Sequence, residues 1–231
     1  MAGLTLPLVL LPGMMCDARL FAPQIAHLSA GRSIMVADLS RDATITAMAA
    51  RVLAEAPPVF ALAGLSMGGI VAMEVLRQAP DRVARLALIA TNPLAETAEV
   101  QAGRAPQMTR AKRGDLAGLM AEAFIPRYLA HPAPALADLC AQMAADLGPK
   151  VFLRQSQALA GRRDQTDTLA AVTCPTLILS GELDQLCPPA RHDLMQDLIP
   201  HARRVRLADT GHLPVLENPE PTNKALSQWL L

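Results

Sequence analysis

A serine between two glycines is the residue of this sequence best placed to act as a nucleophile. Gly64, Ser66 and Gly68 form a Gly-x-Ser-x-Gly pattern directly after the apolar residues 59–63 and before a helical stretch. On such a tight turn from strand to helix the hydroxyl stands clear of the backbone, and the small glycines let the flanking segments pass closely. The pattern predicts a nucleophilic serine, and a serine that caps a helix is the structural alternative.

A serine hydroxyl is a weak nucleophile at neutral pH, so it needs a neighbouring base and a carboxylate that orients this base. His212 is the candidate base, because it follows Gly211 in the loop after the strand-like residues 203–207. Asp184 is the candidate carboxylate, because it lies in the loop after the apolar residues 176–180.

Other acids and histidines of the chain offer alternatives for these two roles. Glu182 and Asp209 lie near the chosen residues, and Asp38 ends a strand-like run at the sheet edge where active sites of open α/β sheets collect. Turn or surface positions explain these three acids more simply. Solvent-exposed or helix-capping positions are expected for the four other histidines, which are His27, His131, His192 and His201.

The chain order Ser66, Asp184, His212 resembles that of the α/β-hydrolase superfamily. Four short segments carry the resemblance along nearly the whole chain, and they are residues 8–13, 64–69, 181–184 and 211–212. The sequence is most similar to small esterase-like members with a helical cap. The resemblance implies a Ser66-Asp184-His212 triad.

Attack on a carbonyl builds negative charge on its oxygen, which two backbone N–H groups can stabilise. Met67 is expected to supply one of them, because it follows the serine at the start of a helix. Met14 is expected to supply the other from the loop after the first strand. Relatives carry His-Gly-x in this loop, whereas this chain has Pro12-Gly13-Met14 and so lacks a side chain that would brace it.

Short apolar runs alternate with helical patterns along most of the sequence, which favours a parallel sheet with helices on both faces. The expected strands are residues 8–11, 33–37, 59–63, 85–90, 176–180 and 203–207. The expected helices are residues 20–28, 44–56, 68–79, 189–199 and 221–231. The prediction is therefore an α/β-hydrolase fold with a mostly parallel sheet of about six strands, without the antiparallel hairpin that begins the family's full sheet.

Residues 93–171 interrupt the alternation with a long helical segment that contains several prolines. The resemblance implies that this segment is a helical cap inserted into a core of residues 1–92 and 172–231, whereas ordinary connecting helices are the alternative. A cap closes over a pocket and excludes water from it. Large side chains of this segment are candidates to line the pocket or to pack the cap, and they are Met120, Phe124, Tyr128, Met143 and Phe152.

Composition limits the classes of partner. The 231 residues are 52% hydrophobic, and 21 basic side chains balance 21 acidic ones, so a nucleic acid or an anionic membrane is not an expected partner. A small apolar or neutral substrate fits better. No apolar run approaches the roughly 18 residues of a membrane helix. A homo-oligomer stays open, because an apolar helix face looks the same against another helix or another subunit.

The first residues and the cysteines bear on the cellular compartment. Residues 1–7 lack a basic segment, so we expect no signal peptide and a cytoplasmic location. Four cysteines are scattered without a Cys-x-x-Cys pair or histidines at metal-ligand spacing, and they are Cys16, Cys140, Cys174 and Cys187. We expect them to be reduced, with no metal and no organic cofactor.

The resemblance implies a serine hydrolase that cleaves small carboxylic esters through an acyl-enzyme, without a cofactor. Lactone or enol-lactone hydrolysis and thioester hydrolysis remain alternatives, since one fold hosts many reactions. A ligand-binding, receptor-like protein with a vestigial triad is the alternative outside enzymes.

Overall fold

Six strands form one parallel sheet at the centre of the part of the chain that is described. The structure is a computed structural model that describes residues 5–231. The expectation that residues 1–7 contain no signal peptide therefore concerns a segment that lies partly outside the described residues. The sheet order is β2-β1-β3-β4-β5-β6, and every neighbouring pair is parallel. The strands are β1 (Leu8–Leu11), β2 (Ile34–Val36), β3 (Phe60–Leu65), β4 (Val83–Ile89), β5 (Thr176–Gly181) and β6 (Arg203–Leu207). The predicted six-stranded parallel sheet is confirmed.

Burial explains which strands lie in the middle. β1, β3 and β5 are buried along their whole length, as expected for parallel strands covered on both faces. The edge strand β6 carries Arg203, Arg204 and Arg206, and charged side chains on an edge discourage pairing with another sheet. Predicted strand ends differ from the observed ends by up to two residues, since hydrogen bonds to a neighbouring strand extend β3 to Leu65.

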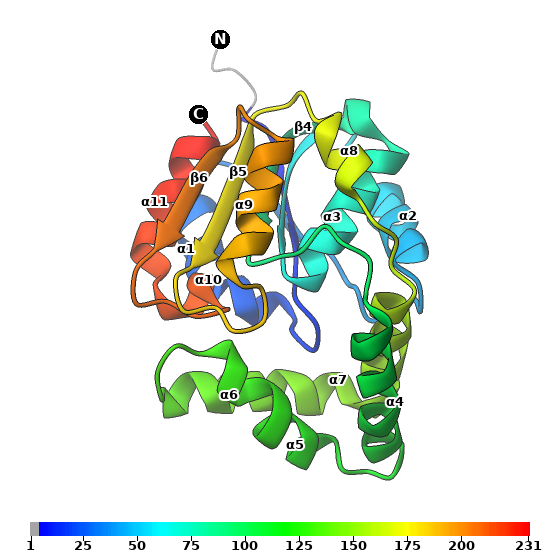
Figure 1. Ribbon diagram of the computed structural model, residues 1–231. Coiled ribbons are helices and arrows are strands. Elements are labelled where there is room, and N and C mark those ends of the chain that lie inside the picture. Colours follow the sequence, from blue (N-terminus) through cyan, green and yellow to red (C-terminus); the bar gives the residue numbers. More distant parts are fainter. Residues whose placement is uncertain (1–4) are drawn as a thin grey trace.

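Helices cover both faces of the sheet (Figure 1). α1 (Ala22–Leu28) packs against α11 (Pro219–Trp229). α2 (Ile45–Glu55), α3 (Met67–Gln78) and α9 (Pro189–Leu198) belong to the other face. The first ten residues of α3 are all buried, which makes it the central helix of that face.

A layer of helices crosses the end of the sheet toward which the arrowheads of β5 and β6 point (Figure 1). We call it the helical layer, and it consists of α4 (Ala98–Lys112), α5 (Leu116–Leu119), the π-helical turn η3 (Met120–Phe124), α6 (Ile125–Tyr128) and α7 (Pro134–Ala160). α7 is broken at Gly148, where φ is 76° and Pro149 follows. α8 (Thr166–Ala170) packs instead against α3 and α9. The division of the chain into a core and a cap at residues 93 and 171 stays a prediction.

The cysteines and the helix lengths add two observations. All four cysteines are free thiols, and Cys16, Cys140 and Cys187 are buried. Between residues 5 and 231, every helix is too short or too polar to cross a membrane.

Candidate active site

Ser66 occupies a sharp turn between β3 and α3. Its backbone angles are φ 54° and ψ −114°, and its side chain makes no capping hydrogen bond to α3. A Cβ on Gly64 would collide with the backbone of Gly68, and a Cβ on Gly68 would collide with the carbonyl of Leu11. The glycines on either side of the serine are therefore required by close backbone approach, as the sequence pattern predicts.

Two hydrogen bonds hold this turn in place. The Ser66 N–H donates to the Ile89 carbonyl at 2.9 Å, and the hydroxyl of Thr91 donates to the Ser66 carbonyl at 2.7 Å. Thr91 is fully buried. Because both backbone groups of Ser66 are bound, its positive φ is fixed by the surrounding structure.

Asp184 and His212 form a buried pair at the ends of β5 and β6. Nδ1 of His212 lies 2.9 and 3.0 Å from the two carboxylate oxygens of Asp184. The same carboxylate accepts the backbone N–H groups of Leu186 at 2.8 Å and Cys187 at 2.9 Å. With Nδ1 facing the carboxylate, Nε2 of His212 is the nitrogen left to act as a base.

The helical layer and Glu217 together fix the loop that carries His212. The His212 N–H donates to the Tyr128 carbonyl at 2.9 Å, and the Tyr128 ring stacks on the imidazole at a centroid distance of 6.0 Å. The Glu217 carboxylate accepts three backbone N–H groups, those of Ala130, Gly211 and Leu213. Glu217 thus fixes the residues on both sides of His212 in the sequence, and the helical layer contacts His212 itself.

Met14 and Met67 present their backbone N–H groups without a hydrogen-bond partner among residues 5–231. Both residues line the same cavity as Ser66. A Cβ on Gly13 would lie 3.6 Å from the Ser66 Cβ, so the loop after β1 passes directly beside the serine. The start of α3 adds the positive end of a helix dipole at Met67.

Gln155 of α7 braces the loop after β1. Its Oε1 accepts the N–H of Met15 at 2.9 Å, and its Nε2 donates to the Leu39 carbonyl at 3.2 Å. Gln155 is 1% exposed, and Met15 has a φ of 56°. The helical layer therefore supplies the support that Pro12 cannot give. The sequence does not reveal this role of Gln155, because a glutamine within a helical pattern carries no local signal of a contact 140 residues away.

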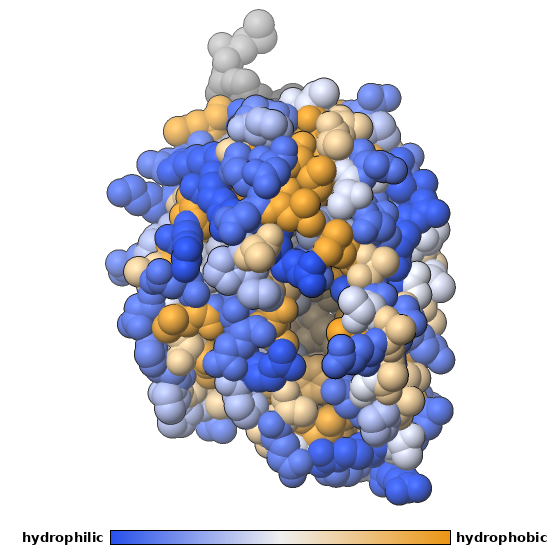
Figure 2. Space-filling model, in the orientation of Figure 1, coloured by the Kyte–Doolittle hydropathy of each residue, from blue (hydrophilic) through white to orange (hydrophobic). Residues whose placement is uncertain are grey.

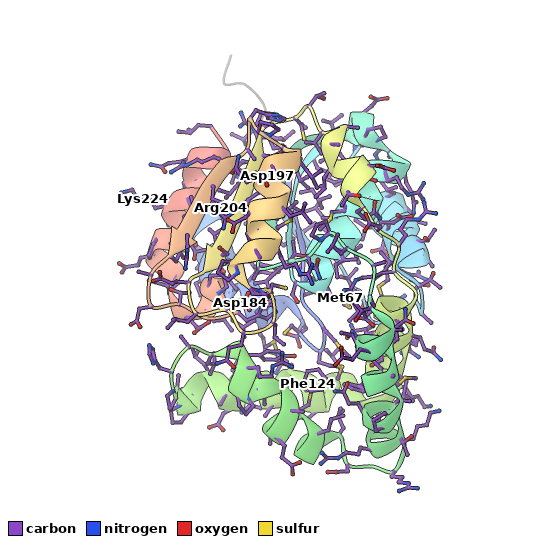
Figure 3. The ribbon with its side chains drawn as sticks, viewed as in Figure 1. Met67, Phe124, Asp184, Asp197, Arg204 and Lys224 are labelled. Carbon is purple, nitrogen blue, oxygen red and sulfur yellow. The ribbon has the colours of Figure 1, made fainter. Side chains whose placement is uncertain are left out.

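A cavity of about 460 Å³ separates the end of the sheet from the helical layer. Figure 3 shows Met67 and Asp184 on the sheet side and Phe124 on the layer side, and Figure 2 shows the surface hollowed there. Ser66 and His212 both line this cavity. Its lining includes the apolar residues Met14, Leu65, Ile70, Phe124, Leu159, Leu186 and Leu213 and the charged residues Glu96, Arg104, Arg127, Arg162 and Arg191.

The five large side chains that are candidates to line the pocket or to pack the cap divide between these two roles. Phe124 and Tyr128 line the cavity, but Met120, Met143 and Phe152 do not. Those three are almost fully buried, and the Phe152 ring packs edge-on against Phe124 at a centroid distance of 5.7 Å. They belong to the packing behind the wall.

The alternative acids lie outside the cavity and make other contacts. Asp38 pairs with Arg41, Glu182 with Arg206, and Asp209 with His131. These three pairs are largely exposed to solvent, which fits the turn or surface positions expected for the three acids.

The expectation for His192 was wrong. Its ring is fully buried in α9, and neither ring nitrogen has a hydrogen-bond partner in the part of the chain that the structure describes. Burial lowers its pKa from 6.5 to about 4, and repulsion from Arg204 and His212 adds to this, while Asp184 acts in the opposite direction. The ring is neutral at pH 7.

Asp184, Cys187 and His212 also lie close enough to hold a metal ion. Burial and the negative charge of Asp184 raise the pKa of the Cys187 thiol, so the sulfur keeps its proton and is a poor ligand. The Asp184 carboxylate is already bound by the imidazole and two backbone N–H groups. This donor set fits a hydrogen-bonded acid and base better than a metal centre.

Comparison with known proteins places these features in a wider group. The sequence model of a family described as "Alpha/beta hydrolase family" matches residues 8–225. A pimeloyl-[acyl-carrier protein] methyl ester esterase of Aromatoleum aromaticum is 29% identical, over 92% of this chain and 93% of its own length. A thermophilic esterase of Thermogutta terrifontis, solved with malate bound, has a TM-score of 0.89 at 30% identity, over 97% of this chain and 89% of its own. An enol-lactonase of Burkholderia xenovorans shares the fold with a TM-score of 0.87 at 23% identity, over 99% of this chain and 91% of its own.

Proposed function

Because the chain belongs to the alpha/beta hydrolase family, we propose that it is a serine hydrolase that cleaves small carboxylic esters through an acyl-enzyme at Ser66. One observation carries the proposal, which is that a nucleophile, a base and two N–H donors border one cavity. They are Ser66 on its strained turn, His212 paired with Asp184, and the backbone N–H groups of Met14 and Met67, which have no partner among residues 5–231. No step of the reaction needs a metal or an organic cofactor.

In the first half-reaction the Ser66 hydroxyl attacks the ester carbonyl while Nε2 of His212 takes its proton. Asp184 keeps the imidazole in the correct tautomer and stabilises the imidazolium that forms. The N–H groups of Met14 and Met67 stabilise the negative oxygen of the tetrahedral intermediate. His212 then protonates the leaving alcohol, and the acyl group stays on Ser66.

In the second half-reaction a water molecule attacks the acyl-enzyme. His212 accepts a proton from this water and returns it to the Ser66 oxygen as the carboxylic acid leaves. The helical layer, which we propose is the cap, limits access of bulk water to the cavity.

The substrate class follows from the lining of the cavity and from the relatives. The apolar residues of the lining accommodate an apolar or neutral acyl or alkyl group, as the composition predicts. Several relatives matched by sequence are named pimeloyl-[acyl-carrier protein] methyl ester esterase. The same steps open a lactone, with the difference that the leaving alcohol stays attached to the acyl group.

The test is the initial rate of hydrolysis of p-nitrophenyl esters of increasing acyl length by the wild type and Ser66→Ala. We expect the rate to fall about a thousandfold or more in Ser66→Ala, because the nucleophile is lost. Ser227→Ala is the matched control, since Ser227 lies on α11 and contacts His27 outside the cavity. Equal rates in the wild type and Ser66→Ala would contradict the proposal.

Inactivity of the wild type on every ester would direct the test to lactones and thioesters. Saturable binding of an ester without turnover would favour the receptor-like alternative, and Ser66→Ala would then retain the binding.

A further inference from the structure

Charge is unevenly distributed over the wall of the cavity beside Ser66. Among the described residues, four arginines and a single carboxylate line it, namely Arg104, Arg127, Arg162 and Arg191 with Glu96. The chain as a whole has no net charge, so this local excess of positive charge is not a consequence of composition.

Two of these arginines share one buried carboxylate. Glu96 accepts hydrogen bonds from both Arg104 and Arg162, and its side chain is 1% exposed. The side chain of Arg162 is 10% exposed and that of Arg104 is 14% exposed. Two cations and one anion leave this buried group with one positive charge, and a buried charge without a counter-ion is costly.

The guanidinium groups of Arg104 and Arg162 also have N–H donors that are not used in hydrogen bonds. Arg104 uses Nε and Nη2 on Glu96, and Arg162 uses Nη1 on Glu96 and Nε on the Leu94 carbonyl. Arg104 Nη1 and Arg162 Nη2 have no partner within residues 5–231. Burial lowers the pKa of Arg162, attraction to Glu96 offsets this only in part, and repulsion from Arg104 adds to it. The group of Arg104, Arg162 and Glu96 therefore has both unused N–H donors and an uncompensated positive charge.

Arg191 adds a third cation to the lining of the cavity. It is half-buried in the first turn of α9, its guanidinium has no partner in the described part of the chain, and no side chain caps this helix. Burial raises the pKa of the Cys187 thiol, and the guanidinium groups of Arg162 and Arg191 both lower it. Arg162, Arg191 and Cys187 all line the cavity.

We propose that Arg104, Arg162 and Arg191 form a subsite that binds an anionic group, a carboxylate or a phosphate, on the ester that Ser66 cleaves. This inference rests on the proposed function and changes its substrate class, because an ester with an anionic group replaces the apolar or neutral substrate expected from composition. The preferred substrate is an ester with an apolar part against the wall of Ile70, Phe124 and Leu159 and a separate anionic group at the arginines. Arginine suits this role because its planar donors bind carboxylate or phosphate oxygens in pairs.

The first test compares monoethyl adipate, a monoanion at pH 7.5, with the neutral diethyl adipate. We expect the wild type to prefer the monoanion, and we expect Arg191→Gln to lower the ratio of the two kcat/KM values by about tenfold or more, the effect of losing a hydrogen bond to a charged group. Arg163→Gln is the matched control, because Arg163 is exposed and lies outside the cavity.

Arg162→Gln is the second variant. Arg162 is more buried than Arg191, so Arg191→Gln keeps the test valid if Arg162→Gln does not fold. An unchanged ratio in Arg191→Gln, or a wild type that prefers diethyl adipate, would overturn the inference and leave the arginines as braces of the helical layer. If hydrolysis requires Ser66 but kcat/KM is the same for the charged and the neutral ester, this inference alone is overturned. If the wild type shows no hydrolysis that Ser66→Ala abolishes, the proposed function is overturned.

Calorimetric titration with adipate and with inorganic phosphate gives a readout that does not need turnover. Binding of adipate alone would identify a carboxylate subsite, and binding of phosphate alone a phosphate subsite. In either case Arg191→Gln should weaken the binding about tenfold or more. Absence of binding of both anions to the wild type would contradict the subsite.

Discussion

The sheet and the helical layer contribute to the candidate site in different ways. The ends of the strands supply Ser66, Asp184 and His212, and backbone hydrogen bonds and close glycine contacts fix them. The helical layer supplies single side chains, such as Gln155 and Arg104, that reach the site from outside the sheet. The groups proposed for the chemistry are thus set by local turns, and the groups proposed to brace the site and select substrates are set by distant packing.

The largest effect is expected within the sheet, from Asp184→Asn. The amide would favour the wrong tautomer of His212, so kcat should fall about ten-thousandfold, as it does when the acid of such a triad is replaced. The measurement is kcat on p-nitrophenyl butyrate, with circular dichroism as the check of folding. Asp209→Asn is the control, because Asp209 pairs with His131 at the surface. A loss of less than about tenfold would show that Asp184 does not orient the base.

A smaller effect is expected from the helical layer, in Gln155→Leu. Without its Oε1, the N–H of the strained Met15 loses its partner and the loop that carries Met14 is free to shift. Loss of one oxyanion donor lowers kcat about a hundredfold or more, so a misplaced donor should lower it by about tenfold to a hundredfold with little change in KM. The measurement is kcat and KM on the same ester, together with the melting temperature.

Gln155→Glu and Gln142→Leu sharpen this experiment. Gln155→Glu keeps an oxygen that can accept the Met15 N–H but loses the donor to the Leu39 carbonyl, so it should recover only part of kcat. Gln142 is exposed on the same helix, and its replacement should leave kcat near the wild-type value. A fall in stability with kcat and KM unchanged would mean that Gln155 acts on folding alone.

The buried His192 of α9 is expected to make the stability of the protein depend on pH. Because the folded state lowers the pKa of His192 from 6.5 to about 4, the unfolded chain binds the proton more tightly. The contribution of His192 is constant above pH 6.5, and this residue alone lowers the stability by roughly 3 kcal/mol as the pH falls from 6.5 to 4. Urea unfolding of the wild type and His192→Leu at a series of pH values measures this, and the variant should lose less over that range. Parallel pH dependences would contradict it.

Local patterns were sufficient to predict the sheet and the residues around Ser66. The Gly-x-Ser-x-Gly turn and the loops that follow the strands at residues 180 and 207 are short, so residue type and spacing determine them. The helix predicted at residues 68–79 is observed as α3 within a residue of each predicted end. Agreement of local preference with the final fold is what permits this.

Contacts between distant segments could not be predicted in the same way. Gln155, Glu217 and the Glu96 carboxylate act through partners 140, 87 and 66 residues away along the chain. In a single sequence, a glutamine or an arginine on a helix looks the same whether it faces water or a cavity. For the same reason the sequence leaves open whether Met143 and Phe152 line the pocket or pack the cap, and the structure shows that they pack behind the cavity lining.

The Glu217 carboxylate has a consequence for the order in which the molecule assembles. It joins Ala130 of the segment between α6 and α7 to the loop at residues 211–213, and these parts of the chain are synthesised far apart in time. Contacts of such long sequence separation form late in folding, because their loop-closure entropy must first be overcome. The β4–β5 pairing, which joins Leu86 to Thr176, closes a loop of similar length. We therefore expect the histidine loop to be completed no earlier than the full sheet, so that the site becomes competent for chemistry only once both are formed.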